Sequence, residues 1–254
     1  MIGMLSRLTI LAISLLCSAN LVFAQSATIA VAANMKDAFG EIANAFKVTN
    51  KSEMRVVYGS SGNFTAQILN GAPFNVFIAA DEQFPLELYK KGKTTNEGVV
   101  YAIGKLALIA KTSSAITLVD DKVQLAKAIA KANKIAIAKP ELAPYGKAAV
   151  EYLKAEGLWD LAKNKLVYGD NVGAATTYVV TGAADLGFTA LSLAKSPELA
   201  KEASYIQLDS RLYEPIKQRM VIMKGAPQEA KDLYQFMQGA QAKAILQKYG
   251  YVTP

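Results

Sequence analysis

Four short polar segments stand where an apolar run of the sequence gives way to a helical pattern. They are Asn34, residues 59–62 (Gly-Ser-Ser-Gly), residues 144–146 (Pro-Tyr-Gly) and residues 170–173 (Asp-Asn-Val-Gly). The first N–H groups of a helix have no partner inside the helix, and that end carries about half a unit of positive charge. Together with Asn, Ser and Tyr donors, four such helix starts could hold a small oxyanion without Lys or Arg. Taken singly, each segment also fits an ordinary helix cap or surface turn.

The residue types favour one kind of oxyanion. A fully deprotonated tetrahedral oxyanion only accepts hydrogen bonds, so donors alone suffice to bind it. A monoprotonated phosphate also donates a hydrogen bond and therefore needs an acceptor such as a carboxylate. No carboxylate stands at the centre of the four segments, since Asp37 follows one helical turn later and Asp170 fits a cap. This pattern favours sulfate-like, molybdate-like or tungstate-like ligands.

The composition excludes several classes of chemistry. The 254 residues include no His and a single Cys, Cys17. A Ser-His-Asp triad, an imidazole base, a zinc site built from His or several Cys and an intrachain disulfide are therefore impossible. We expect neither a catalytic residue nor a cofactor, and no site for a metal cation.

Residues 1–24 have the features of a cleavable secretory signal peptide. Arg7 is followed by the apolar run 8–17, and residues 22–24 (Val-Phe-Ala) resemble a cleavage site. The apolar run is too short to span a bilayer comfortably, and Leu16 before Cys17 argues against a lipoprotein anchor. We therefore expect a periplasmic protein, whose net charge falls from +7 to +6 when Arg7 is removed.

Apolar β-rich runs alternate with amphipathic helical stretches along the rest of the chain. The alternation predicts an α/β protein with mostly parallel sheets. The predicted strands are 27–33, 54–58, 76–80, 106–110, 134–138, 165–168, 184–188, 205–208 and 220–223. The predicted helices are 35–47, 64–70, 85–91, 123–132, 146–156, 172–181 and 190–195, with one or two more between 228 and 249. In parallel α/β sheets, ligands bind beyond the carboxyl ends of the strands, which is where the four polar segments stand.

The mature chain resembles the periplasmic molybdate-binding proteins of ABC-type importers. The matching segments include IAVAANMKDAFGEIANAF, NGAPFNVFIAADE, DNVGAATTYVVTGAADLGF and the closing QGAQAKAILQKYGY. The resemblance implies a type II periplasmic binding protein fold, with two α/β lobes and a ligand cleft between them. It implies lobe 1 at 25–104 plus 224–254, lobe 2 at 105–223, and a hinge near 104–110 and 220–224.

The resemblance also implies which residues contact the oxyanion. The contacts fall on Asn34 and Ser61 in lobe 1 and on Tyr145 and Val172 in lobe 2, with Val172 contributing its backbone N–H. The residues expected around them are Ala33, Ser60, Gly62 and Asn171.

Two positions depart from the family pattern. Asn34 stands where Ser is common, and Ala190 stands where many members have a Tyr that donates to the anion. We expect the phenol of Tyr145 to supply the missing donor.

The expected function is the capture of molybdate, and also of tungstate, for delivery to the membrane permease of an ABC importer. We expect a monomer. We also expect no binding of nucleic acid, because the Lys residues are spread over helix faces rather than gathered in a block. Three alternatives stay open: a binding protein for sulfate or another tetrahedral oxyanion, an exported hydrolase using Asp81 or Glu82, and a sensory ligand-binding module.

Overall fold

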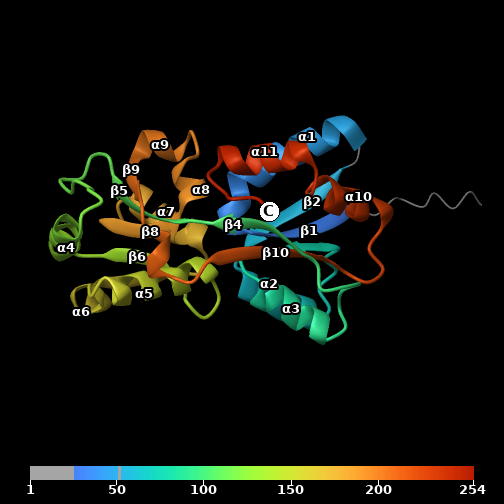
Figure 1. Ribbon diagram of the computed structural model, residues 1–254, viewed down its shortest axis with the longest axis horizontal. Helices are drawn as coiled ribbons and strands as arrows, with labels where there is room; N and C mark the ends of the chain where they lie inside the picture. Colours follow the sequence, from blue (N-terminus) through green and yellow to red (C-terminus); the bar gives the residue numbers. More distant parts are fainter. Residues whose placement is uncertain (1–25, 51–52) are drawn as a thin grey trace, which may run out of the picture.

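The computed structural model describes residues 26–50 and 53–254, so the predicted signal peptide lies outside the described residues. The chain forms two five-stranded sheets, each covered by helices on both faces (Figure 1). This arrangement confirms the predicted two-lobed α/β class. Among the described helices, none is long and apolar enough to cross a membrane.

The first sheet has the strand order β2-β1-β3-β10-β4. Its strands are β1 (Ala27–Ala32), β2 (Met54–Gly59), β3 (Val76–Ile78), β4 (Val99–Gly104) and β10 (Ile216–Ile222). Its helices are α1 (Lys36–Asn50), α2 (Ser61–Leu69), α3 (Gln83–Lys90), α10 (Gln228–Phe236) and α11 (Ala240–Lys248). Helices α1 and α11 cover one face, and α2 and α3 cover the other (Figure 1). We call this sheet and its helices the first lobe.

The second sheet has the strand order β7-β6-β8-β5-β9. Its strands are β5 (Leu106–Lys111), β6 (Ile135–Ala138), β7 (Leu166–Gly169), β8 (Leu186–Ala190) and β9 (Ala203–Gln207). Its helices are α4 (Lys122–Lys131), α5 (Pro144–Ala155), α6 (Trp159–Ala162), α7 (Val172–Val180), α8 (Leu191–Ala194) and α9 (Leu199–Glu202). Short 3₁₀ turns lie at Ala33–Met35, Lys163–Lys165 and Ser210–Leu212. We call this sheet and its helices the second lobe.

Burial of apolar residues on both faces of each sheet explains the layers. Strand β1 is buried along nearly its whole length, as expected for a strand covered on two sides. In α1, Phe39, Ile42 and Phe46 recur at helical spacing and are fully buried against β1. In β5, consecutive residues such as Leu108 and Ile109 point to opposite faces of the second sheet and join separate clusters there.

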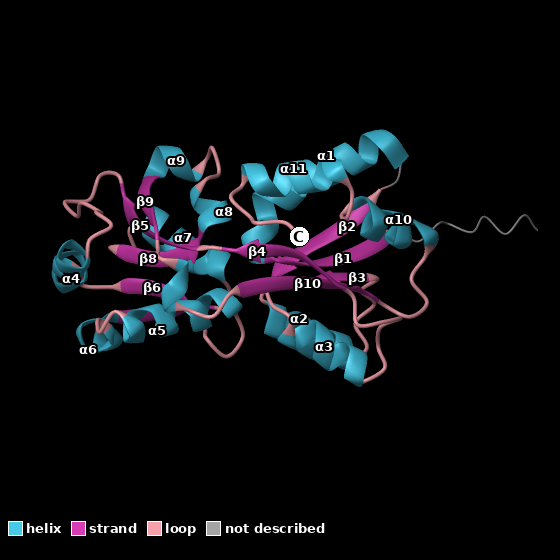
Figure 2. Cartoon of the chain, in the orientation of Figure 1, coloured by secondary structure: helices cyan, strands magenta, loops and turns pink. Residues whose placement is uncertain are grey.

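The sheets are mixed rather than mostly parallel. Strands β1, β2 and β3 pair in parallel, as do β6, β7 and β8. Strand β10 runs antiparallel to β3 and β4, and β5 runs antiparallel to β8 and β9. Strands β5 and β10, which make the antiparallel pairs, are the strands that the chain enters directly after passing from one lobe to the other (Figure 2). The two passages therefore account for the departure from mostly parallel sheets.

The chain crosses between the sheets at two places. The first crossing is at Lys105, between β4 and β5. The return differs from expectation, because residues 216–222 were expected in the second lobe but pair in the first sheet as β10. The chain therefore returns before Ile216 and not at 220–224. Strand β4 itself was not predicted.

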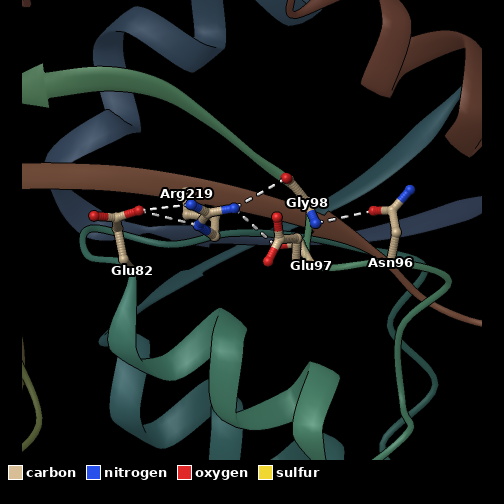
Figure 3. A network of polar contacts seen from close by, with 5 residues as sticks. All are labelled: Glu82, Asn96, Glu97, Gly98 and Arg219. Atoms are coloured by element: carbon tan, nitrogen blue, oxygen red, sulfur yellow. Dashed lines mark hydrogen bonds and ion pairs between the residues drawn. The ribbon is translucent and has the colours of Figure 1, made fainter.

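Within the first lobe, Arg219 links β10 to the residue before α3 and to the residues before β4 (Figure 3). We call β4 and β10, the first-lobe strands next to the two crossings, the crossing strands. Arg219 of β10 donates to Glu82, with 2.7 Å between Nη2 and Oε1, and it also donates to the carbonyl oxygens of Glu97 and Gly98 just before β4. The side chain of Arg219 is only 14% exposed, so water screens this contact less than a surface pair. Glu82 therefore has a structural partner, which weakens its candidacy as a catalytic carboxylate.

Candidate functional site

The four polar segments predicted from the sequence converge on one small cavity between the lobes. The cavity is lined by Ala32, Ala33, Asn34, Gly59, Ser60, Ser61, Ala80, Ala143, Pro144, Tyr145, Asn171 and Val172. The four expected contact residues Asn34, Ser61, Tyr145 and Val172 are thus brought together. Of the residues expected around them, Ala33, Ser60 and Asn171 also border the cavity.

Gly62, the fourth residue expected around the contact residues, lies where the two lobes touch. It does not border the cavity, and its N–H donates to the carbonyl oxygen of Leu142 in the second lobe, at 2.9 Å. A Cβ atom at Gly62 would lie 3.0 Å from the Cα of Leu142. Glycine at this position therefore permits the close approach of the two lobes.

The start of α2 supplies Ser61, whose side chain is fully buried. Its Oγ accepts a hydrogen bond from the N–H of Ala80 at 2.9 Å, which leaves the Ser61 hydroxyl hydrogen available to a ligand. Ser60 caps the helix, since its Oγ accepts from the N–H of Asn63 at 3.4 Å. The helix is therefore capped by one serine while the next faces the cavity.

The starts of α5 and α7 supply backbone donors from the second lobe. Pro144 occupies the first helical position of α5, so Tyr145 carries its first N–H. Asn171 caps α7 by accepting from the N–H of Ala174 at 3.0 Å, and Val172 follows it. Within the described residues, no backbone acceptor is found for the N–H of Tyr145 or Val172. Both groups are available at the cavity wall.

The phenol of Tyr145 lies beside β10 and the end of β4. Its oxygen is 3.0 Å from Nε2 of Gln218, and a Cβ atom at Gly104 would lie only 2.1 Å from it. Glycine at the end of β4 thus makes room for the phenol. The phenol is therefore held by Gln218, whereas the backbone N–H of Tyr145 lies at the start of α5.

Asn34 is 1% exposed and is held on several sides. Its Nδ2 lies 3.0 Å from Oε1 of Gln218 and 2.8 Å from the hydroxyl of Tyr251. Ser192 donates to its backbone oxygen at 2.8 Å. Its Oδ1 is buried and has no hydrogen-bond partner among the described residues.

The electrostatics of the cavity come from neutral donors. No Asp, Glu, Lys or Arg occurs among the described residues that border it. Burial raises the pKa of Tyr101, Tyr145 and Tyr251 above the usual value of a phenol, so all three keep their hydroxyl hydrogen at any working pH. Asp81 follows the cavity residue Ala80 in the chain, and burial raises the pKa of its carboxyl to about 7.

Two larger grooves lie at the edges of the contact between the lobes. One, of about 580 Å³, is bordered by Lys36, Asp37 and Glu198, and the other, of about 590 Å³, by Asp81, Lys147 and Glu214 among others. Both carry carboxylates that would repel an anion, so the smaller cavity fits an oxyanion better. In the part of the chain that the structure describes, no group of three or more Cys, Asp or Glu side chains could hold a metal ion.

Sequence reasoning missed the residues behind Asn34. Gln218, Tyr101, Tyr251 and Ser192 come from four distant parts of the chain. Gln218 and Tyr101 lie inside strands and Tyr251 follows the last helix, whereas Ser192 is the second residue of α8, directly after β8. Ser192 lies in the predicted helix 190–195, and Tyr251 is the last residue of the closing segment that resembles the family, but neither position indicates a contact with Asn34. Gln218 and Tyr101 are brought to Asn34 by β10 and β4.

Two lobes that place neutral donors around a shared cavity define a two-lobed solute-binding protein. The sequence matches the family described as "Bacterial extracellular solute-binding protein" over residues 27–252. The chain belongs to this family, whose members bind solutes for transport and are not enzymes, as expected from the sequence.

Two curated relatives are similar along most of the chain, and each is named "Molybdate-binding protein ModA". The relative from Azotobacter vinelandii is 38% identical over 93% of this chain and 92% of its own length. The relative from Rhodobacter capsulatus is 36% identical over 88% of this chain and 87% of its own length.

Solved structures show the same fold. The Azotobacter vinelandii periplasmic molybdate-binding protein superposes with a TM-score of 0.81, at 34% identity, over 90% of this chain and all of that chain. The sulfate-binding protein SubI from Mycobacterium tuberculosis reaches a TM-score of 0.74 over 90% of this chain and 86% of that chain. Its identity of 14% shows a shared fold alone.

Proposed function

We propose that this chain captures molybdate between its two lobes and delivers it to the membrane permease of an ABC importer. The observation that carries the proposal is the cavity, which is bordered by hydroxyl, amide and backbone N–H donors from both lobes and by no charged side chain. Relatives of known name at 36–38% identity support the choice of molybdate. Tungstate has the same tetrahedral shape and charge, so the proposal includes it.

The contacts follow from which donors are available. Ser61 donates its hydroxyl, and Tyr145 and Val172 donate backbone N–H groups. Asn34 borders the anion with its side-chain amide, which donates when its NH₂ end is turned toward the cavity. Each helix start contributes about half a unit of positive charge, so three of them offset much of the charge of a dianion. The protein acts as a monomer without cofactor, metal cation or nucleic acid, and the lobes move relative to each other about the two crossings.

The size of the cavity requires a small movement on binding. Its volume is about 10 Å³, which is near the lower limit for one water molecule. A tetrahedral oxyanion is larger, so the walls separate slightly to admit it. The Gly62–Leu142 hydrogen bond between the lobes is the contact most directly affected.

The cellular place of the protein belongs to the same proposal. Membership of an extracellular solute-binding family supports export, and residues 1–24 would direct it. The mature chain would then meet its ligand in the periplasm.

Thermal unfolding of the chain without residues 1–24 tests the choice of ligand. A ligand that binds only the folded state adds about 2.7 kcal/mol at 100 times its Kd, which corresponds to a Tm increase of roughly 5–10 °C for a protein of this size. We expect molybdate and tungstate to raise Tm and phosphate to leave it unchanged. A larger increase with sulfate than with molybdate would instead establish a sulfate-binding protein.

A further inference from the structure

Gln218 lies at the centre of the buried network behind the cavity. It stands on β10, is fully buried, and contacts Asn34 and Tyr101 of the first lobe and Tyr145 of the second. It does not border the cavity itself. Any influence of Gln218 on the ligand must therefore pass through the residues that it contacts.

A β-bulge places Gln218 and Tyr101 side by side. Gln218 pairs with Ala102 of β4, but the next residue, Arg219, pairs with Val100, so Tyr101 has no partner in the register. Bulges commonly redirect a side chain next to a functional site. Here the Tyr101 hydroxyl reaches the Gln218 amide, at 2.8 Å from Oε1, and the carbonyl oxygen of Ala79, at 2.9 Å.

The hydrogen atoms of this network determine which way the two amides face. The oxygen and nitrogen ends of an amide have nearly the same shape, so the hydrogen-bond partners decide between them. With Oε1 of Gln218 toward Tyr101, that tyrosine's single hydrogen faces two acceptors. In the same arrangement, Oδ1 of Asn34 is buried without any partner.

Turning both amides by 180° removes both conflicts. Nε2 of Gln218 then donates to the Tyr101 hydroxyl and to Oδ1 of Asn34, and Tyr101 donates to the carbonyl of Ala79. The Tyr145 hydroxyl donates to Oε1 of Gln218. The Tyr251 hydroxyl, 2.8 Å from the same atom of Asn34, gives its one hydrogen to Oδ1 and so no longer donates to Ser192 or to the Asn34 carbonyl oxygen. That carbonyl oxygen keeps the hydrogen bond from Ser192.

After this turn, only the NH₂ group of Asn34 lacks an acceptor. It occupies the position at which Oδ1 is otherwise unpartnered. Asn34 borders the cavity, whereas Gln218 and Tyr251 do not, so this end of the amide is the one on the cavity side. The missing acceptor is then an oxygen atom of the bound anion.

We infer that Gln218 is a positioning residue that determines specificity: it fixes the Asn34 amide with NH₂ toward the anion, so that the cavity rejects an oxyanion carrying a proton. This rests on the proposed function. With the opposite orientation, Oδ1 of Asn34 would accept a hydrogen bond from hydrogen phosphate. The orientation of one amide therefore separates molybdate from hydrogen phosphate, and Gln218 sets it. The same network uses the Tyr145 phenol to hold Gln218 and leaves the Tyr145 N–H for the anion.

The variant Gln218→Glu tests this inference. A carboxylate only accepts, so Asn34 must turn its NH₂ toward Glu and its Oδ1 toward the cavity. At pH 8, molybdate and hydrogen phosphate both carry two negative charges, so repulsion by the new carboxylate cancels in the ratio of their Kd values. We expect this ratio to shift toward hydrogen phosphate by about tenfold or more, as for loss of one hydrogen bond to a charged group.

Gln218→Met is the matched control. It has a similar length but leaves Asn34 free to turn, so both anions should bind with a smaller shift in the ratio. Circular dichroism and the Tm establish that each variant folds. A folded Gln218→Glu variant with the wild-type ratio would overturn the inference, even though the wild type binds molybdate.

A measurement on the wild-type protein covers the case in which the variants do not fold. The side-chain NH₂ signals of Asn34 in a ¹H–¹⁵N NMR spectrum, identified by their loss in Asn34→Asp, should shift on adding molybdate and exchange more slowly with water. Unchanged signals in molybdate-saturated protein would contradict the inference. If wild type binds sulfate but not molybdate, the proposed function fails, and the same comparisons with sulfate against hydrogen phosphate still test Gln218. Failure to bind any of these anions would overturn both.

Discussion

Ser61 shows how a single side chain both builds the cavity and serves the ligand. Its oxygen is fixed by the N–H of Ala80, so its hydroxyl hydrogen is directed by the fold rather than by water. A donor fixed before the ligand arrives loses little entropy on binding. Ser60, the neighbouring residue, serves the helix instead by capping α2.

Ser61→Ala should weaken molybdate binding by roughly 1–3 kcal/mol, because a dehydrated oxygen of the anion loses its donor. Isothermal titration calorimetry measures the change. The matched control is Ser60→Ala, which should cost about 1 kcal/mol of stability through the lost cap while changing affinity much less. Equal losses of affinity in the two variants would argue against a direct contact from Ser61.

Asp81 should make the stability of the protein depend on pH. Burial raises its pKa to about 7, and the N–H of Phe84 and the charge of Lys147 offset this only in part. In the unfolded chain the pKa is about 3.9, so between pH 4 and pH 7 the folded state holds a proton that the unfolded state releases. Stability therefore falls as the pH rises through this window and levels off above it.

Asp81→Asn imitates the protonated carboxyl and should remove this dependence. We expect wild type to lose roughly 1–3 kcal/mol of unfolding free energy relative to the variant between pH 5 and pH 8. Urea denaturation at the two pH values measures it. Parallel stability curves for the two proteins would show that Asp81 is ionised across the whole range.

At the scale of elements, helix starts from both lobes meet at close range. The start of α2 touches the loop before α5 through the hydrogen bond from Gly62 to Leu142. The atoms around Gly62 leave no space for a side chain at this position. A Cβ atom there would lie 3.0 Å from Leu142 Cα and 3.1 Å from its oxygen, and backbone atoms cannot move aside as a flexible side chain can. The close approach of the two lobes thus depends on one glycine.

Gly62→Ala should therefore hold the lobes further apart than the slight separation that admits the anion, and so weaken molybdate binding, mainly through a faster dissociation rate. Stopped-flow displacement measures this rate. Gly40→Ala in α1 is the control, because a Cβ atom there meets nothing within 4 Å. It should stabilise the helix by about 0.5–1 kcal/mol without changing binding. Dissociation at the wild-type rate in Gly62→Ala would contradict a role for this contact.

Elements with a clear period were predictable, and elements defined by pairing were not. The spacing of Phe39, Ile42 and Phe46 predicted α1, and the Gly-Ser turn predicted the start of α2 within three residues. Strand β4 escaped prediction because residues 99–110 form one nearly continuous apolar run, in which only Gly104 and Lys105 mark the crossing. The assignment of 216–222 to the first sheet depends on pairing with β3 and β4, which no local pattern encodes.

The candidate site was predictable to the same extent. Asn34, Ser61, Tyr145 and Val172 follow strands at helix starts, which is a local signal, and the structure gathers all four at one cavity. Gln218 lies inside a strand, and its contact with Tyr101 depends on a bulge at Tyr101 in the facing strand β4. Bulges arise from the match between two strands, so a single segment of sequence does not reveal them.

At the scale of the whole molecule, segments far apart in the chain build one cavity. Asn34 and Tyr251 stand near opposite ends of the described chain, and Gln218 on a crossing strand connects them to Tyr145 of the second lobe. The donors of one lobe alone would form only half of the wall. Affinity should therefore depend on the lobes coming together, as in hinge closure of two-lobed binding proteins.

A crystal structure of the protein with tungstate would show directly whether the anion binds between the two lobes, because the anomalous scattering of tungsten locates the ion without assumptions about its shape. We expect one strong peak between the lobes, with tungstate oxygens within hydrogen-bond distance of Ser61 Oγ, Tyr145 N, Val172 N and the Asn34 side chain. A peak in the groove beside Lys36 or Lys147, with the cavity between the lobes empty of tungsten, would contradict this expectation.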